Sequence, residues 1–254
     1  MNLETKIALR YLKSKKTHNA VNIISIISVL GVVVATAALV CVLSVFNGFH
    51  GLIESKLSKL DPEIAIQPAV GKVMPDGDSV VRVVRRIPGV QQAMPVVVDN
   101  ALAIFADFQM PVRLKGVPDD YNKMTAIDSI IVEGDFQLRD QVSRYAVLGA
   151  GPAMTLNARP GYLRELQLYA PQRQGAVNIN DPMNAFTNDS VFVAGVFQVQ
   201  QKSYDQDLIY VPIDLARELF DYDTQATQVE LKLAPGAHER QVMQQASQAL
   251  GPGY

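Results

Sequence analysis

Cysteine and histidine are scarce in this chain of 254 residues, which holds one cysteine and three histidines. The single Cys41 excludes an intrachain disulfide framework and a thiolate metal cluster. His18, His50 and His238 lie far apart in the sequence and have no metal-ligand spacing. We therefore expect no metal site, and folding that rests on the burial of apolar side chains.

Motifs for nucleotide binding and catalysis are also missing. The sequence contains no Gly-x-x-x-x-Gly-Lys-Ser/Thr P-loop, no Gly-x-Ser-x-Gly elbow and no His-Glu-x-x-His pair. The run from Tyr145 to Met154 has the outline of a strand and a dinucleotide-binding turn, but Met154 replaces the third glycine. We interpret this run as a strand that passes into a helix. We expect no cofactor and no catalytic residues, so any ATP-driven work needs a separate subunit.

Charge is balanced overall but uneven along the chain. The net charge is −2, and against Glu4 the first 19 residues carry the cations Lys6, Arg10, Lys13, Lys15 and Lys16. This bulk composition argues against a nucleic-acid partner. Leu3, Ile7 and Tyr11 recur every four residues, which predicts a basic amphipathic helix over 1–19 that lies along the inner leaflet of a membrane. The alternative is a solvated basic tail.

The longest apolar run, residues 20–49, contains no charged residue. Because about 20 apolar residues span a bilayer, this run predicts a transmembrane helix. The rival interpretation, a cleaved signal peptide, has an apolar region of only about 7 to 15 residues. Cations next to a span tend to remain in the cytoplasm. We therefore expect a membrane protein with a cytoplasmic N-terminus and with residues 48–254 outside the cytoplasm.

Small residues recur within the predicted span. Ser25, Ser28 and Gly31 follow each other at intervals of three, which places them near one face of the helix. Such faces commonly pack on other membrane helices, although the same residues could be scattered at random in a lone anchor. Our candidates for helix packing or for a gate that contacts membrane lipid are Ser25, Ser28, Gly31, Ser44, Asn47 and Phe49.

Beyond the span the sequence predicts a mixed α+β domain. Helical character continues through a short stalk, residues 50–60, until Asp61-Pro62 breaks it. Strands and helices recur in two flanking segments, residues 61–118 and 207–254, whereas the strong segments in 119–206 are strands. We infer an α+β base built from both flanks, with a β-rich subdomain inserted between them.

Two of the predicted strands carry charged residues at alternate positions. Lys115 alternates with apolar residues in the strand over 111–116, which indicates a sheet with one wet face. Glu230 takes the same kind of polar position in the strand over 228–233.

A long polar segment, residues 171–190, separates a strand that ends at Ala170 from one that begins at Val191. Loops of this length in compact domains are often functional. Its apolar residues either grip a partner protein or an acyl chain, or fold back as an ordinary packed loop. The candidate binding residues of this loop are Arg173, Val177, Ile179, Met183, Phe186 and Asn188.

Two runs carry a family resemblance: Ile7-Ala8-Leu9-Arg10-Tyr11-Leu12 and Val42-Leu43-Ser44-Val45-Phe46-Asn47-Gly48-Phe49. With them the chain resembles the start of Lol-type lipoprotein-releasing permeases (LolC and LolE), within the wider FtsX and MacB group of ABC transporter membrane subunits. The resemblance implies a bacterial inner-membrane protein with a cytoplasmic elbow helix at 1–19 and a periplasmic domain after the first span, so that residues 50–254 are periplasmic. That domain comprises a discontinuous Porter-like part, 61–118 and 207–254, and a Sabre-like insert, 119–206.

The resemblance also implies a function and its partners. Such permeases work with a cytoplasmic ABC ATPase and a second permease subunit, in a homo- or heterodimer. They extract lipoprotein cargo from the inner membrane and pass it to a periplasmic carrier protein. Because further spans are implied, we expect this chain to be a fragment of one subunit.

In the LolC branch a protruding hairpin, the Hook, recruits the carrier, and residues 171–190 fall at its place. In that branch, basic or amide residues are typical just before the returning strand. This sequence has Asn188-Asp189 at that place. An alternative function is mechanotransmission of the MacB or FtsX kind, in which the domain acts on an efflux partner or a cell-wall hydrolase. A membrane-anchored enzyme is disfavoured because nucleophile, metal and phosphate motifs are missing.

Overall fold

The computed structural model describes residues 7, 10, 19–57, 62–172 and 186–254. They belong to two compact units, Met1–Ser55 and Lys56–Tyr254. The predicted basic helix over 1–19 therefore lies almost entirely outside the described residues.

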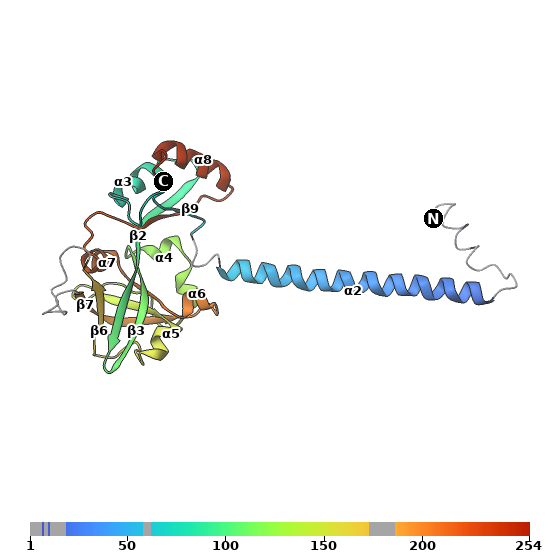
Figure 1. The fold of residues 1–254 in the computed structure, drawn as a ribbon, viewed down its shortest axis with the longest axis horizontal. Coiled ribbons are helices and arrows are strands. Elements are labelled where there is room, and N and C mark those ends of the chain that lie inside the picture. Colours follow the sequence, from blue (N-terminus) through green and yellow to red (C-terminus); the bar gives the residue numbers. More distant parts are fainter. Residues whose placement is uncertain (1–6, 8–9, 11–18, 58–61, 173–185) are drawn as a thin grey trace. The chain divides into compact units, whose positions relative to one another are not determined.

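The first unit consists mainly of one long helix, α2 (Asn19–Leu57), drawn in blue in Figure 1. Among the described residues, its segment Ile23–Phe49 is the one long and apolar enough to cross a membrane, with a mean hydropathy of 2.9. Apolar side chains along this segment are exposed, as a lipid-facing surface requires. The helix continues beyond Phe49 into the predicted stalk.

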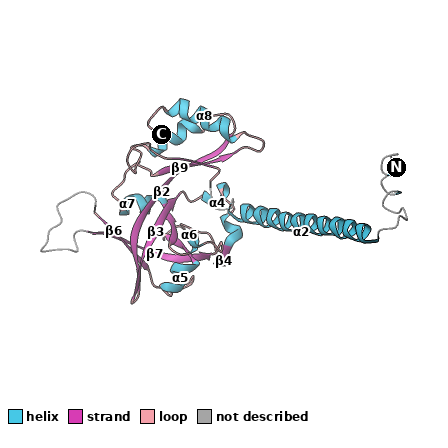
Figure 2. Cartoon of the chain, turned by 45° about the vertical axis from the view of Figure 1, so that its right-hand side comes forward, coloured by secondary structure: helices cyan, strands magenta, loops and turns pink. Residues whose placement is uncertain are grey.

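The second unit is an α+β domain in which short helices pack on a large sheet (Figure 2). Its described strands are β1 (Ile64–Ile66), β2 (Val90–Phe105), β3 (Phe108–Val117), β4 (Ile131–Gly134), β5 (Tyr145–Gly149), β6 (Leu166–Pro171), β7 (Phe186–Phe197), β8 (Leu208–Pro212) and β9 (Gln228–Leu233). Its described helices are α3 (Gly77–Val84), α4 (Tyr121–Met124), the 3-10 helix η1 (Ile127–Ile130), α5 (Ala150–Thr155), α6 (Lys202–Asp205), α7 (Ile213–Leu219) and α8 (Glu239–Leu250). The predicted α+β class with one N-terminal apolar helix is confirmed.

Six of the described strands close into a barrel. The sheet runs in the order β1-β9-β2-β3-β8-β5-β7-β4, and β6 pairs with both β2 and β7. The circuit β2-β3-β8-β5-β7-β6 therefore returns to β2. All six strands contribute side chains to the largest core, including the fully buried Leu114, Leu148, Leu166, Leu168 and Ile209.

The long strand β2 belongs to both parts of the sheet. Its first half pairs with β9 as far as Val96, which lies opposite Gln228, and its second half pairs with β3 from Val97 onward. Around the first half, α3, α8, β1 and β9 enclose a core of their own, at the end of the domain that carries the C-terminus (Figure 1). The β2 strand thus links this core to the barrel.

Local sequence signals explain where helix α3 begins and which of its faces is buried. Asp76 caps α3, because its carboxylate accepts a hydrogen bond from the Ser79 amide at 2.9 Å. Val80, Val81 and Val84 then fall on the buried face of this helix, at the spacing expected of an amphipathic helix.

The proposed division at residues 118 and 207 stays a prediction. One continuous sheet runs through both flanks and the insert: β3 and β8, one from each flank, pair with each other, and β8 also pairs with β5 of the insert.

Candidate functional site

The residues expected to act in the membrane lie on α2, but they do not form one stripe. At about 100° per residue, Ser25, Ser28 and Gly31 spread over about 120° of the helix, and Ser44 and Asn47 widen that spread beyond half the circumference. The Ser28 hydroxyl donates to the Ile24 carbonyl at 2.9 Å, so the helix itself satisfies it. All of the candidates are exposed, and their role in packing or gating stays a prediction: Ser25, Ser28, Gly31, Ser44, Asn47 and Phe49.

The predicted loop of residues 171–190 is shorter than expected. Strands β6 and β7 pair antiparallel from Leu166 opposite Val191 to Pro171 opposite Phe186. The returning strand therefore begins at Phe186, and the expected start at Val191 is wrong. The polar run before Val191 has no strand signal of its own, but β6 supplies partners for its backbone groups.

Two candidate residues of this hairpin can be placed. Phe186 is 45% exposed and Asn188 is exposed, both on the β7 arm, where Asn188 lies opposite Tyr169 of β6. The other four candidates lie outside the described residues: Arg173, Val177, Ile179 and Met183.

Arg144 anchors the β7 arm at its base. One guanidinium nitrogen lies 2.6 Å from the Asp189 carboxylate on β7, and another lies 2.7 Å from Glu218 on α7. Burial opposes the charged form of Arg144, but the hydrogen bond to Glu218 and the field of Asp189 outweigh it, so the pKa of Arg144 is raised. Asp189 is acidic where Lol-type sequences typically have a basic or amide residue. Its carboxylate is neutralised here by Arg144.

Two further carboxylates, Asp214 on α7 and Asp140 before β5, have lowered pKa values. The pKa of Asp214 is lowered because, although burial acts in the opposite direction, Arg139 donates a hydrogen bond to the carboxylate. The pKa of Asp140 is lowered chiefly because the Tyr145 hydroxyl donates to it at 2.6 Å. The same contact raises the pKa of Tyr145.

These shifts predict a loss of stability in acid. Both carboxyls have a folded-state pKa below the unfolded value of 3.8, so their contribution is present above that pH and is lost as pH falls through the folded pKa. We expect an Asp140→Asn/Asp214→Asn variant to flatten the decline of the unfolding free energy in this window. Denaturant titrations of both proteins at several acidic pH values measure the slope, and parallel curves would contradict the assignment.

Lys115 on β3, Tyr121 on α4 and Glu230 on β9 form a buried polar cluster that the sequence did not reveal. The Lys115 ammonium lies 2.7 Å from Glu230 and donates to the Tyr121 hydroxyl at 2.9 Å. That hydroxyl donates to Glu230 at 2.6 Å, and the Gln228 amide donates to the same carboxylate at 2.6 Å. Glu230 is fully buried and Lys115 is 8% exposed, so the wet-face position expected for Lys115 is wrong.

The cluster lies where β2 changes partner. There the Thr227 amide donates to the Val96 carbonyl at 2.9 Å, and the Val98 amide donates to the Thr227 hydroxyl at 2.7 Å. The Lys115–Glu230 ion pair and these two hydrogen bonds together join the barrel to the α3–α8 part of the domain.

The glycine-rich run that follows Tyr145 has a steric explanation. It forms β5 and then α5, as predicted. A Cβ atom at Gly151 would lie 2.6 Å from the Asp205 carbonyl oxygen and 2.8 Å from Gln206 Cα. Glycine is therefore required there for α5 to pack on the backbone of the segment that ends α6.

Comparison with known proteins identifies the family. The chain matches the family described as MacB-like periplasmic core domain over residues 25–249. Its fold is similar to the extracellular domain of the noncanonic ABC-type transporter YknZ from Gram-positive bacteria, with a TM-score of 0.50 and 14% identity over 73% of this chain and 91% of that chain. It is also similar to the periplasmic region of MacB from Actinobacillus actinomycetemcomitans, with a TM-score of 0.51 and 12% identity over 73% and 81% of the two chains.

No curated protein matches the chain. Because the family match extends over most of the sequence, the chain belongs to the MacB-like periplasmic core domain family, within the FtsX/MacB superfamily of ABC transporter permeases.

Proposed function

We propose that this chain is part of a Lol-type permease subunit, which extracts lipoproteins from the inner membrane and passes them to a periplasmic carrier. Its N-terminus would be cytoplasmic and residues 50–254 periplasmic. The partners would be a cytoplasmic ABC ATPase, a second permease subunit, lipoprotein cargo, the carrier and membrane lipid. Residues 61–118 and 207–254 would form the Porter-like part, with 119–206 as the Sabre-like insert.

The β6–β7 hairpin carries this proposal. Its register brings Pro171 and Phe186 opposite each other, so the segment between them connects two paired arms, as the Hook of the LolC branch does. Phe186 and Asn188 are exposed on one arm, and Arg144 holds that arm through Asp189. A hairpin with exposed residues on an anchored arm is suited to docking a carrier.

Replacement of residues 173–185 by a two-residue Asn-Gly turn tests this function. We expect the full chain to keep its fold and to lose capture of the purified carrier, measured by biolayer interferometry. Interface energy concentrates in a few large side chains, so Phe186→Ala should weaken capture by on the order of 1 to 2 kcal/mol. Val142→Ala, which truncates a side chain that is 93% exposed outside the hairpin, is the matched control and should change neither capture nor stability.

The opposite pattern would refute the docking role. Unchanged capture together with a loss of several kcal/mol in folding stability would identify the segment as packed core.

A second candidate function is mechanotransmission of the MacB or FtsX kind. The family match and the likeness of fold to the periplasmic region of MacB favour it. The two functions differ in their partner. Capture of an efflux partner or a cell-wall hydrolase by the full chain, with no capture of a lipoprotein carrier, would select mechanotransmission.

A further inference from the structure

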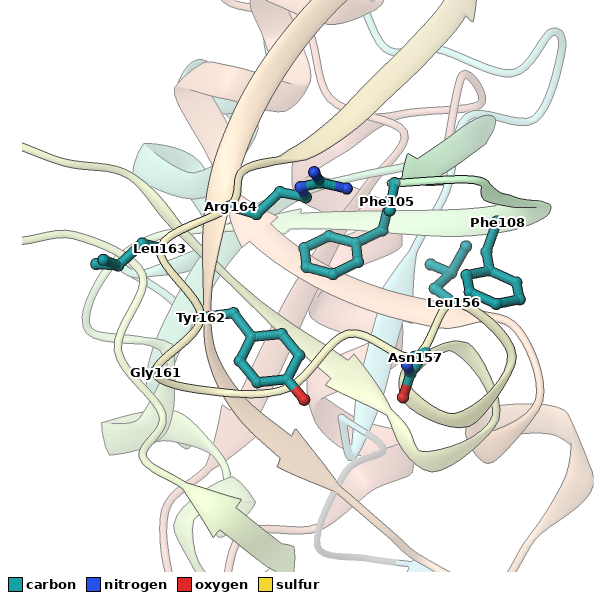
Figure 3. A pocket seen from close by; sticks show the side chains of 9 residues that line it. Phe105, Phe108, Leu156, Asn157, Gly161, Tyr162, Leu163 and Arg164 are labelled. Atoms are coloured by element: carbon teal, nitrogen blue, oxygen red, sulfur yellow. The ribbon is translucent and has the colours of Figure 1, made fainter.

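An apolar groove lies beside the turn between β2 and β3. It has a volume of about 450 Å³ and is bounded by that turn and by the loop between α5 and β6 (Figure 3). Its lining residues are Phe105, Ala106, Phe108, Leu156, Asn157, Gly161, Tyr162, Leu163 and Arg164.

Several apolar side chains in and next to the groove are exposed to water. Phe108 is 48% exposed, Tyr162 is 46% exposed and Leu163 is 96% exposed. Met154 on α5, shortly before the lining residue Leu156, is 76% exposed. Single exposed apolar residues are common, but a group contributed by three adjoining segments marks an interaction surface.

The shape of the groove is fixed by its backbone. The β2–β3 ladder ends at Phe105 opposite Phe108, so Ala106 and Asp107 alone make the turn. Ala106 has a φ of 54° and Asn157 a φ of 53°, in the left-handed region where a non-glycine residue costs about 1 kcal/mol or more. The pairing of Phe105 with Phe108 on either side of the turn holds Ala106 there.

The aromatic rings are held in place as well. Phe105 is buried and its ring stacks on Tyr162, with centroids 6.1 Å apart and planes inclined by 22°. Figure 3 shows these two rings next to each other, with Phe108 on the other side of the groove and Leu163 pointing outward. Preformed aromatic surfaces of this kind lose little conformational freedom on binding.

The lining of the groove also contains one positively charged side chain, Arg164. Arg164 is the single charged residue among the described residues that line it, and it has no ion pair with any residue in the described part of the chain. The neighbouring Arg159, by contrast, lies 2.6 Å from Glu133. Arg164 is therefore available to a carboxylate that arrives with a partner.

We propose that this groove docks a segment of a partner protein in which an apolar side chain is followed closely by a carboxylate. The apolar side chain enters between Phe108 and Tyr162, and the carboxylate pairs with Arg164. Aromatic residues and arginine are the types that dominate protein interfaces. The groove is open to solvent, so an acyl chain bound in it would remain wet on one side, whereas a protein surface covers Phe108, Tyr162 and Leu163 together.

The location makes this surface independent of the proposed carrier hairpin. The groove lies next to Leu163-Arg164, before β6 begins, and the hairpin connection follows Pro171, where β6 ends. If the hairpin does not bind a carrier, the groove can still bind a partner segment, and the reverse also holds.

Selection of a displayed library of random dodecapeptides on the detergent-solubilised full chain tests the proposal. Peptides that also bind the Phe108→Ala/Arg164→Gln variant are removed. We expect the retained sequences to share a leucine, methionine or phenylalanine a few positions from an aspartate or glutamate. Synthetic copies should bind about tenfold more weakly to each single variant, and should bind Val142→Ala as they bind the unmodified chain.

Three outcomes would overturn the proposal. The first is that every peptide that binds the unmodified chain also binds the double variant. The second is that retained peptides tolerate lysine in place of their acidic residue. The third is that oleate, an acyl chain with a carboxylate, binds in a variant-sensitive way while the peptides do not, which would assign the groove to lipid. Circular dichroism of each variant verifies that its fold is retained.

Discussion

Glu230→Gln and Lys115→Met are each expected to lower the free energy of unfolding of the full chain by about 3–5 kcal/mol. Glu230 is fully buried, and its carboxylate lies 2.7 Å from Lys115 and 2.6 Å from the Tyr121 hydroxyl. Either substitution leaves the remaining charge buried without its partner, and desolvation makes that state costly. Denaturant titration followed by circular dichroism measures the change.

Two controls separate this effect from a general loss of charge. Arg159→Gln breaks an ion pair of similar length, 2.6 Å to Glu133, in which both side chains are partly exposed, and should cost no more than about 1 kcal/mol. Lys115→Met/Glu230→Leu removes both charges and should cost less than the two single changes added together. Single variants no less stable than Arg159→Gln would show that the cluster has no energetic role.

Leu168→Ala is expected to cost about 2–5 kcal/mol of unfolding free energy. Leu168 is fully buried in the barrel core on β6, opposite Ala103 of β2 at the seam where the barrel closes. The truncation removes contacts and leaves a cavity between strands that cannot move together without breaking the circuit.

Leu163→Ala is the matched control for Leu168→Ala, because the same atoms are removed from a side chain that is 96% exposed. It should change stability by less than about 0.5 kcal/mol. Similar losses for the two variants would contradict the closed barrel, since Leu168 would then be no better packed than a surface residue.

The elements with a local signal were predictable from the sequence. Alternation of apolar residues predicted β9 with the bounds it has, Gln228–Leu233. Strand β2 begins at Val90, in a stretch whose Pro95 and two glutamines do not predict a strand, because β9 provides partners for its backbone groups. Pairing between distant strands, which a local pattern does not contain, therefore decided the missed boundaries.

The candidate site was less predictable for the same reason. Charged residues at alternate strand positions usually face water, and the sequence does not reveal that α4 and β9 bring Tyr121 and Glu230 over Lys115. The signal that could have found the cluster is the opposite charge at equivalent positions of two strands. The groove had a weak signal too, because Tyr162-Leu163 follow the turn-forming Pro160-Gly161.

The shared strand β2 has a consequence for biosynthesis. A ribosome adds about 5–20 residues per second, so roughly 7 to 26 seconds separate the synthesis of Val96 from that of its β9 partner Gln228. During that interval the first half of β2 and the whole of β1 have unpaired backbone groups, because both depend on β9. The domain therefore completes its fold only after its last strand has been made, and until then these segments need protection from aggregation.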